Sequence, residues 1–240
     1  MFETRGGNAA NTATALSHLS TSMFATSSLS QSHSPIRSIT VKLLTKLGDD
    51  SIRNQLCQEL TSSGVDLSSD LFLKGDKHST SHVTTIIVSE KEHTRTCIFH
   101  PGTCGEITPE DIDRVILRKN GMEKLFENVV HFHSDSRHTK AAVILAKEAK
   151  RRNIPVSVDV ERDRGKDMDA LLELATMVFT NQDQMSDYMD RKRREGAFTS
   201  ISPPYLHSPQ LAPHIAAATN LAFHFFSQYS APFKDVIMTR

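Results

Sequence analysis

Short apolar runs alternate with stretches of helical periodicity over the second half of the chain. The apolar runs predict strands at Val129–Phe132, Val156–Val160, Met177–Phe179 and Asp235–Thr239. Apolar residues spaced along one helix face predict helices at Arg137–Arg152, Met168–Ala175, Gln182–Arg194 and Leu211–Gln228. Strands and helices that alternate in this way form right-handed βαβ units. The pattern therefore predicts an α/β fold with a parallel sheet, whose ligands bind beyond the carboxyl ends of the strands.

The first half of the chain has a different pattern. A strand is predicted at Ile39–Leu44, and an amphipathic helix at Ser51–Ser63. Val83–Val88 and Arg95–Phe99 are rich in β-branched and apolar residues and flank a polar turn. This arrangement indicates a β-hairpin within residues 79–100.

Residues 17–38 are rich in serine, and no acidic residue occurs between Glu3 and Asp49. A segment with so few large apolar residues has little to bury in a core. We therefore expect a flexible, low-complexity insertion between a first helix and the strand that follows it.

Composition narrows the class of protein. Lys and Arg number 28 and Asp and Glu number 28, so the chain has no net charge. Nucleic acids and anionic membranes select a basic excess, so neither is an expected partner. Cys57, Cys97 and Cys104 lack Cys-x-x-Cys spacing and read as reduced thiols. With no membrane-length apolar run and no secretory signal, we expect a cytoplasmic protein, a plastid being the less favoured alternative.

The segment Gly6–Leu19 carries the most informative chemistry. Gly6 and Gly7 allow the backbone to adopt positive φ and to pass close to a ligand. Asn8 and Asn11 are three residues apart and share one face of a helix start. Their carboxamides offer donors and acceptors that suit sugar hydroxyls. The alternative is a glycine turn and an Asn cap that open an Ala-rich helix.

Further motifs follow in a characteristic order, namely Thr45–Asp50, Gly64–Ser68 and Thr94–Gly102. Together with the first motif they resemble the ribokinase-like (PfkB) carbohydrate kinases. Ile154–Arg162 is most similar to the ketohexokinase-like branch of that family. The resemblance covers almost the whole chain. It implies a ribokinase-like parallel sheet flanked by helices with a small β lid, and ATP- and Mg²⁺-dependent phosphoryl transfer to a sugar hydroxyl.

The resemblance also implies site residues. It assigns substrate binding to Gly7, Asn8 and Asn11, beside Gly6. Arg95 resembles an arginine that approaches the phosphates or the substrate, although a solvated edge-strand arginine is the alternative. The family often forms a homodimer through its lid strands, which makes a second copy a candidate partner beside the small-molecule sugar.

Residues near predicted strand ends supply the remaining candidates. His131 and His133 alternate on one strand and face the same side, and His138 follows; zinc binding is an alternative that lacks a further ligand at suitable spacing. We expect His133 and Asp135 to lie at the carboxyl edge of the sheet, near the substrate. Arg137 resembles the arginine that follows this strand in the ketohexokinase-like branch, which makes it a further substrate-binding candidate.

Cofactor candidates occur at the next two strand ends. Asp159 and Glu161 could hold Mg²⁺ through water or position the phosphoryl donor, or could be solvated acids. Asn181 resembles the start of an Asn-x-x-Glu loop that supports Mg²⁺, but Gln184 occupies the fourth position. No metal ligand set is assigned.

Catalytic residues are not identified in the chain. The family draws its base and its anion hole from a Gly-Ala-Gly-Asp segment, but none occurs here and Gly196 is the last glycine. The resemblance thus implies that residues 1–240 form a partial kinase domain, incomplete at both ends. It places the expected catalytic base beyond Arg240. The alternatives are a catalytically inactive sugar-binding pseudokinase and a non-functional fragment.

Overall fold

The computed structural model describes residues 6–27, 39–67, 72–117, 121–196 and 235–238. The chain divides into two compact units, Met1–Leu125 and Phe126–Arg240, which are described separately. No helix among the described residues is long and apolar enough to cross a membrane.

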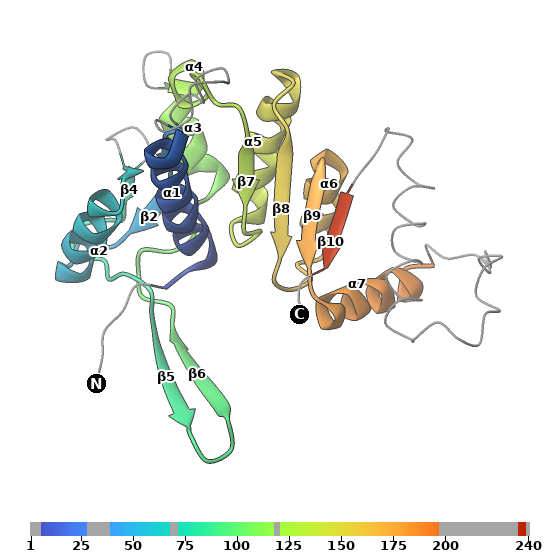
Figure 1. The fold of residues 1–240 in the computed structure, drawn as a ribbon. Helices are drawn as coiled ribbons and strands as arrows, with labels where there is room; N and C mark the ends of the chain where they lie inside the picture. The colour runs from blue at the N-terminus through green and yellow to red at the C-terminus, as the bar shows by residue number, and fades with distance from the viewer. Residues whose placement is uncertain (1–5, 28–38, 68–71, 118–120, 197–234, 239–240) are drawn as a thin grey trace. The chain divides into compact units, whose positions relative to one another are not determined.

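The first unit contains helices and short strands in mixed order (Figure 1). Its helices are α1 (Asn8–Ser27), α2 (Ser51–Ser62), α3 (Pro109–Leu117) and α4 (Gly121–Leu125). Its strands are β1 (Val41–Lys42), β2 (Thr45–Leu47), β3 (Val65–Asp66), β4 (Phe72–Lys74), β5 (Val83–Ser89) and β6 (Thr94–His100). β1 pairs with β3 and β2 with β4, both in parallel, and β5 pairs with β6 antiparallel. The predicted strand at Ile39–Leu44 is thus shorter than expected, and a second strand follows it.

Helix α1 corrects the sequence prediction for the serine-rich segment. The helix continues to Ser27, so residues 17–27 are helical, and residues 28–38 lie outside the described residues. Ala13, Ser17 and Ser20 form a buried stripe of small side chains, and Ser20 Oγ donates to Ile39 O at 3.2 Å. A Cβ on Gly64 would lie 2.7 Å from Ser17 Oγ, so the backbones approach closely there. Small size, rather than hydrophobicity, lets these serines pack.

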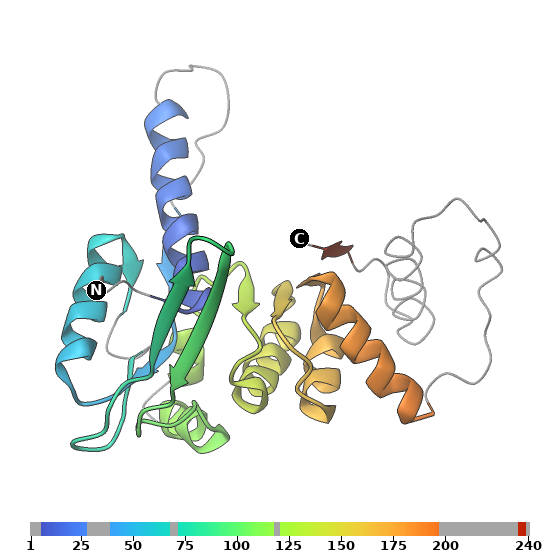
Figure 2. The same cartoon turned by 90° about the horizontal axis from the view of Figure 1, so that it is seen from below.

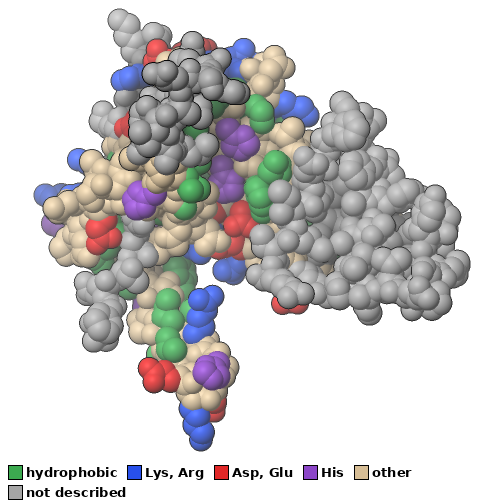
Figure 3. Space-filling model, in the orientation of Figure 1, with side chains coloured by type: hydrophobic (Ala, Val, Ile, Leu, Met, Phe, Trp, Pro, Cys, Tyr) green, Lys and Arg blue, Asp and Glu red, His purple; other side chains and the backbone are tan. Residues whose placement is uncertain are grey.

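The hairpin of β5 and β6 projects from the first unit (Figure 1). It carries exposed apolar side chains on both strands: Val83, Ile86, Ile87, Val88, Ile98 and Phe99. Figure 3 shows apolar side chains along the hairpin and charged side chains gathered toward its turn. Such a surface on a two-stranded ribbon is unusual, because an isolated hairpin has no core of its own to bury it.

The second unit is a four-stranded parallel sheet with helices. The strands β7 (Phe132–Ser134), β8 (Val156–Val160), β9 (Met177–Thr180) and β10 (Asp235–Met238) lie in the order β10-β9-β8-β7. The helices are α5 (Thr139–Arg151), α6 (Lys166–Leu174) and α7 (Gln182–Arg194). Helices α5 and α6 lie on one face of the sheet (Figures 1 and 2). The buried residues include Val156, Val158 and Val160 of β8 and Ala146, Leu171 and Leu172 of the helices.

Two sequence predictions for the second unit differ from the structure or fall outside it. The first strand begins at Phe132 rather than at Val129, because it pairs with Val156, and Val130 is 76% exposed. The helix predicted at Leu211–Gln228 lies outside the described residues. The observed architecture is nonetheless the α/β arrangement of parallel strands and flanking helices that the alternating pattern predicts.

Candidate functional site

The glycine and asparagine motif lies at the start of α1. Gly7 adopts φ +96°, a conformation that favours glycine, and its carbonyl accepts a hydrogen bond of 2.9 Å from Asn11 N. Asn8 is half-buried and Asn11 is exposed, one helical turn further along. A Cβ on Gly6 or Gly7 would meet no atom of the described residues within 4 Å, so these residues leave the approach to this backbone open. The arrangement leaves room for a ligand beside the helix start.

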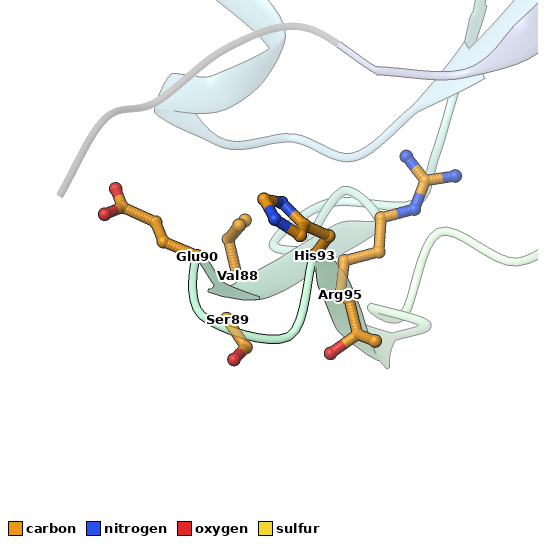
Figure 4. A pocket seen from close by; sticks show the side chains of 6 residues that line it. Val88, Ser89, Glu90, His93 and Arg95 are labelled. Carbon is orange, nitrogen blue, oxygen red and sulfur yellow. The ribbon is translucent and has the colours of Figure 1, made fainter.

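Arg95 lies near the turn of the hairpin, in the same unit. Its Cα pairs with that of Val88, and the next pair toward the turn is Ser89 with Thr94. A shallow concavity at this end is lined by six residues: Val88, Ser89, Glu90, His93, Thr94 and Arg95 (Figure 4). Every lining residue belongs to the hairpin itself. Arg95 is therefore an exposed cation on the hairpin, and no hydrogen bond or ion pair among the described residues joins it to the Asn motif.

The strand-end candidates come together in the second unit. Asp135 and Arg137 follow β7, and Glu161 follows β8. Arg137 Nε donates to Glu161 Oε2 at 3.2 Å and lies 3.9 Å from Asp135 Oδ2. Arg164, which the sequence analysis did not select, places Nη2 4.0 Å from Glu161 Oε2. The carboxyl edge of the sheet thus carries a cluster of ion-paired carboxylates and guanidinium groups.

This pairing decides between two roles for the cluster. Glu161 is already opposed by two guanidinium groups, which makes it a poorer ligand for Mg²⁺ than an unpaired carboxylate would be. A guanidinium group, by contrast, matches the geometry of phosphate oxygens. The arrangement is better suited to an anion that competes with Glu161 for Arg137 than to a cation held by Glu161.

His133 and His131 share a partner that sequence reasoning missed. That partner is the hydroxyl of Ser157. Its Oγ lies 2.8 Å from Nδ1 of His133 and 2.7 Å from Nε2 of His131. Burial lowers the pKa of both imidazoles, and Asp159 and Asp135 partly offset this for His133. A hydroxyl has one proton, so with both imidazoles neutral it donates to one ring and accepts from the other. The signal was available only in the register, where His133 pairs with Ser157 on the next strand.

Asn181 has a structural role in the helix that follows β9. Its side-chain oxygen accepts a hydrogen bond of 2.9 Å from Gln184 N and so caps α7. The two positions that the sequence analysis compared with a Mg²⁺ loop are therefore joined by an ordinary N-cap. Within the described ranges no group of three His, Cys, Asp or Glu side chains is placed to hold a metal ion.

The parallel sheet with helices along it, the charged strand ends and the separate hairpin define a ribokinase-like α/β protein. The family model described as "pfkB family carbohydrate kinase" matches residues 2–199, so the chain belongs to that family. No match was found among curated proteins.

Solved structures support the same fold at low sequence identity. The 2-dehydro-3-deoxygluconokinase of Thermotoga maritima is 16% identical with a TM-score of 0.61, over 98% of this chain and 62% of that one. An Anopheles gambiae adenosine kinase, solved with P1,P4-di(adenosine-5) tetraphosphate, is 15% identical with a TM-score of 0.59, over 82% and 54%. An E. coli protein described as a ribokinase II, solved with ATP and Mg²⁺, is 17% identical with a TM-score of 0.54, over 84% and 57%. The chain thus spans little more than half the length of these proteins.

Proposed function

We propose that this chain supplies the sugar-binding part of an ATP-dependent carbohydrate kinase of the ketohexokinase-like branch. The observation that carries the proposal is the open helix start of α1, where Gly7 at φ +96° precedes Asn8 and Asn11 in a chain of the PfkB family. Amide side chains beside a helix N-terminus pair with hydroxyl groups through both donors and acceptors. Gly6, Gly7, Asn8 and Asn11 would bind the sugar, and Arg95 would approach it from the hairpin.

The strand-end cluster would serve the phosphoryl donor. Arg137 would bind a phosphate group, and His133 lies on β7, the strand that leads to Arg137. Asp159 is an oxygen donor at the same edge of the sheet and would hold Mg²⁺ through water, with Glu161 and Asn181 beside it. Mg²⁺, when bound, would neutralise charge on the phosphates.

A second candidate is sugar binding without turnover. The 240 residues contain no Gly-Ala-Gly-Asp segment, from which the family draws its base and anion hole. These two contributions are each worth on the order of 10²-fold or more in rate. Sugar binding and ATP turnover are therefore separate questions for this chain.

The exposed apolar hairpin supports a further part of the proposal, a homodimer. A second copy of the hairpin would bury Ile86, Ile87 and Phe99, which are 51%, 56% and 53% exposed. Sedimentation of the purified chain over a range of concentrations would test this association.

Ligand-observed NMR titration with a panel of hexoses and pentoses tests the sugar site. We expect saturable binding of at least one sugar and its loss in Asn11→Ala. The matched control is Asn54→Ala, an exposed asparagine on α2, which should bind as the parent does. If no sugar binds saturably, or if Asn11→Ala binds as well as the parent, the proposed site is wrong.

A further inference from the structure

The two ends of the hairpin meet the turn between β2 and α2, where the hairpin projects from the rest of the first unit. We define the hairpin base as residues 79–82, which lead into β5, and residues 101–104, which follow β6. Thr80 N donates to Thr103 Oγ1 at 2.9 Å, and Thr103 N and Cys104 N each donate to Thr80 O at 3.0 Å. The two sides of the base are therefore tied to each other below the hairpin.

The base is also tied to the turn between β2 and α2. Ser81 N donates to Asp50 Oδ2 at 2.6 Å, and Ser81 Oγ donates to Asp50 Oδ1 at 3.0 Å. Ser81 Oγ in turn accepts a hydrogen bond of 2.9 Å from Gly48 N, and Asp49 N donates to Ser79 O at 2.7 Å. Ser81 is 3% exposed, so these bonds are shielded from water.

Close backbone contact adds to these hydrogen bonds. A Cβ on Gly48 would lie 2.5 Å from Ser81 N, and one on Gly102 would lie 2.5 Å from Thr80 O. A Cβ on Gly75 would overlap Ser79 Oγ and would lie 3.0 Å from Cys104 Cβ. A side chain does not fit at these three glycines, so the backbones pack closely at the base, and Gly102 at φ +61° also needs its glycine.

Asp50 joins this base to a helix. Besides its two bonds with Ser81, its Oδ1 accepts a hydrogen bond of 3.0 Å from Arg53 N and so caps α2. Partial burial raises the pKa of Asp50, but hydrogen bonds from Ser81 and Arg53 outweigh burial and hold the pKa below its ordinary value. The carboxylate is therefore charged at neutral pH and serves the hairpin and the helix at once.

We infer that Asp50 is a positioning residue that fixes the hairpin to the N-terminus of α2, so that the two move as one body. Any displacement of the hairpin over a ligand would then carry α2 with it, because Ser81 and Asp50 tie the hairpin base to the start of the helix. A hairpin held in this way would already be oriented when a sugar arrives. Less conformational entropy of the hairpin would then be lost on binding. This last consequence rests on the proposed function, whereas the attachment itself does not.

Distance measurement between two spin labels tests the attachment. One label is placed on the exposed native Cys97 of β6, and the other on Gln58→Cys of α2 in a Cys57→Ala background. Cys104 is 5% exposed and stays unlabelled. We expect a narrow distribution of label-to-label distances for this parent. We expect a broader distribution in both Asp50→Asn and Ser81→Ala.

The two variants remove different parts of the anchor. Asn at position 50 keeps an oxygen for Arg53 N and Ser81 Oγ but turns an amide N–H toward Ser81 N, so it retains the cap and loses the shorter of the two bonds to the base. Ser81→Ala leaves the bond between Asp50 and Arg53 in place. If Asp50→Asn unfolds α2, the distances in Ser81→Ala decide whether the hairpin is fixed to the helix. Glu59→Gln, on the same helix and bonded there to Gln55, is the control and should stay narrow.

The inference is overturned if the parent distribution is already broad, or if both variants remain as narrow as the parent. Sugar titration of the same proteins gives an independent result. Weaker sugar binding in both variants supports a role of the anchored hairpin in capture. Unchanged sugar affinity with broadened distances keeps the anchor and removes that role. If the parent binds no sugar, the proposed function fails while the distances still decide the anchor.

Discussion

Ser136 shows how much depends on a single backbone conformation at the edge of the sheet. It has φ +62°, is 0% exposed, and its Oγ has no hydrogen-bond partner among the described residues. A left-handed conformation is costly for a residue with a Cβ, and so is a buried hydroxyl without a partner. The loop that carries Asp135 and Arg137 is thus held in place against local strain.

Ser136→Gly should therefore raise the free energy of unfolding, by about 1 kcal/mol, because the relief of backbone strain outweighs the greater conformational entropy that glycine gives the unfolded chain. Urea unfolding at pH 7 measures the effect. Ser136→Ala separates the two causes, since it removes the hydroxyl and keeps the Cβ, and it should stabilise less. A Ser136→Gly variant that is less stable than the parent would contradict this account.

The two histidines bonded to Ser157 make stability depend on pH. Their pKa values are lowered by burial from the ordinary 6.5, so the unfolded chain takes up protons first as the pH falls. The stability that this gives is present above pH 6.5 and declines as the pH drops below that value. We expect unfolding free energies measured at pH 7 and pH 5 to differ in this direction.

His133→Gln should reduce that loss between pH 7 and pH 5, because glutamine keeps a polar side chain but takes up no proton. His18→Gln, at an exposed position on α1, is the control and should leave the loss unchanged. If His133→Gln shows the same loss as the parent, the histidines are not its source.

At the scale of elements, α7 is joined to α6 by a partly buried cluster of charged side chains. Arg191 Nη2 donates to Asp169 Oδ1 at 2.6 Å, and Lys192 Nζ donates to Asp169 Oδ2 at 2.7 Å. Arg191 also pairs with Asp163, and its Cζ lies 5.1 Å from the centre of the Tyr188 ring. The side chains of Arg191, Lys192 and Asp169 are only 13%, 12% and 16% exposed. One carboxylate of α6 thus holds two cations of α7.

Asp169→Asn should destabilise the protein by about 1–3 kcal/mol, because it leaves two partly buried cations short of their acceptor. Chemical unfolding with far-UV circular dichroism measures the loss. The matched control is Asp190→Asn on α7, whose pair with Arg193 is 56% and 66% exposed and should be worth less than about 1 kcal/mol. Equal effects of the two variants would show that burial of the pair does not matter.

At the scale of the whole molecule, the question is whether sugar binding and catalysis occur together. We expect the 240-residue chain to show no sugar-dependent ADP release in a coupled assay, since no Gly-Ala-Gly-Asp segment is present to supply the base and the anion hole. Turnover at about 1 per second, an ordinary rate for a kinase, would refute this expectation.

Local spacing was enough to determine several elements and the family. The run Val156–Val160 and the helix Gln182–Arg194 were predictable from a short apolar run and from helical spacing. The hairpin strands were predictable because β-branched and apolar residues flank a polar turn. The motif from Gly6 to Asn11 pointed to the PfkB family, which the match over residues 2–199 confirms. These are properties of neighbours along the chain.

Tertiary structure decided what spacing could not encode. Helix α1 continues into the serine-rich segment, and there Ser17 fits against Gly64, a contact that hydrophobicity does not reveal. Ser157 meets two histidines only through the register of β7 and β8, and Asp50 meets Ser81 across 31 residues of sequence. Hydrogen-bond partners depend on which backbones lie side by side, and this is set by the packing of the whole unit rather than by the local pattern.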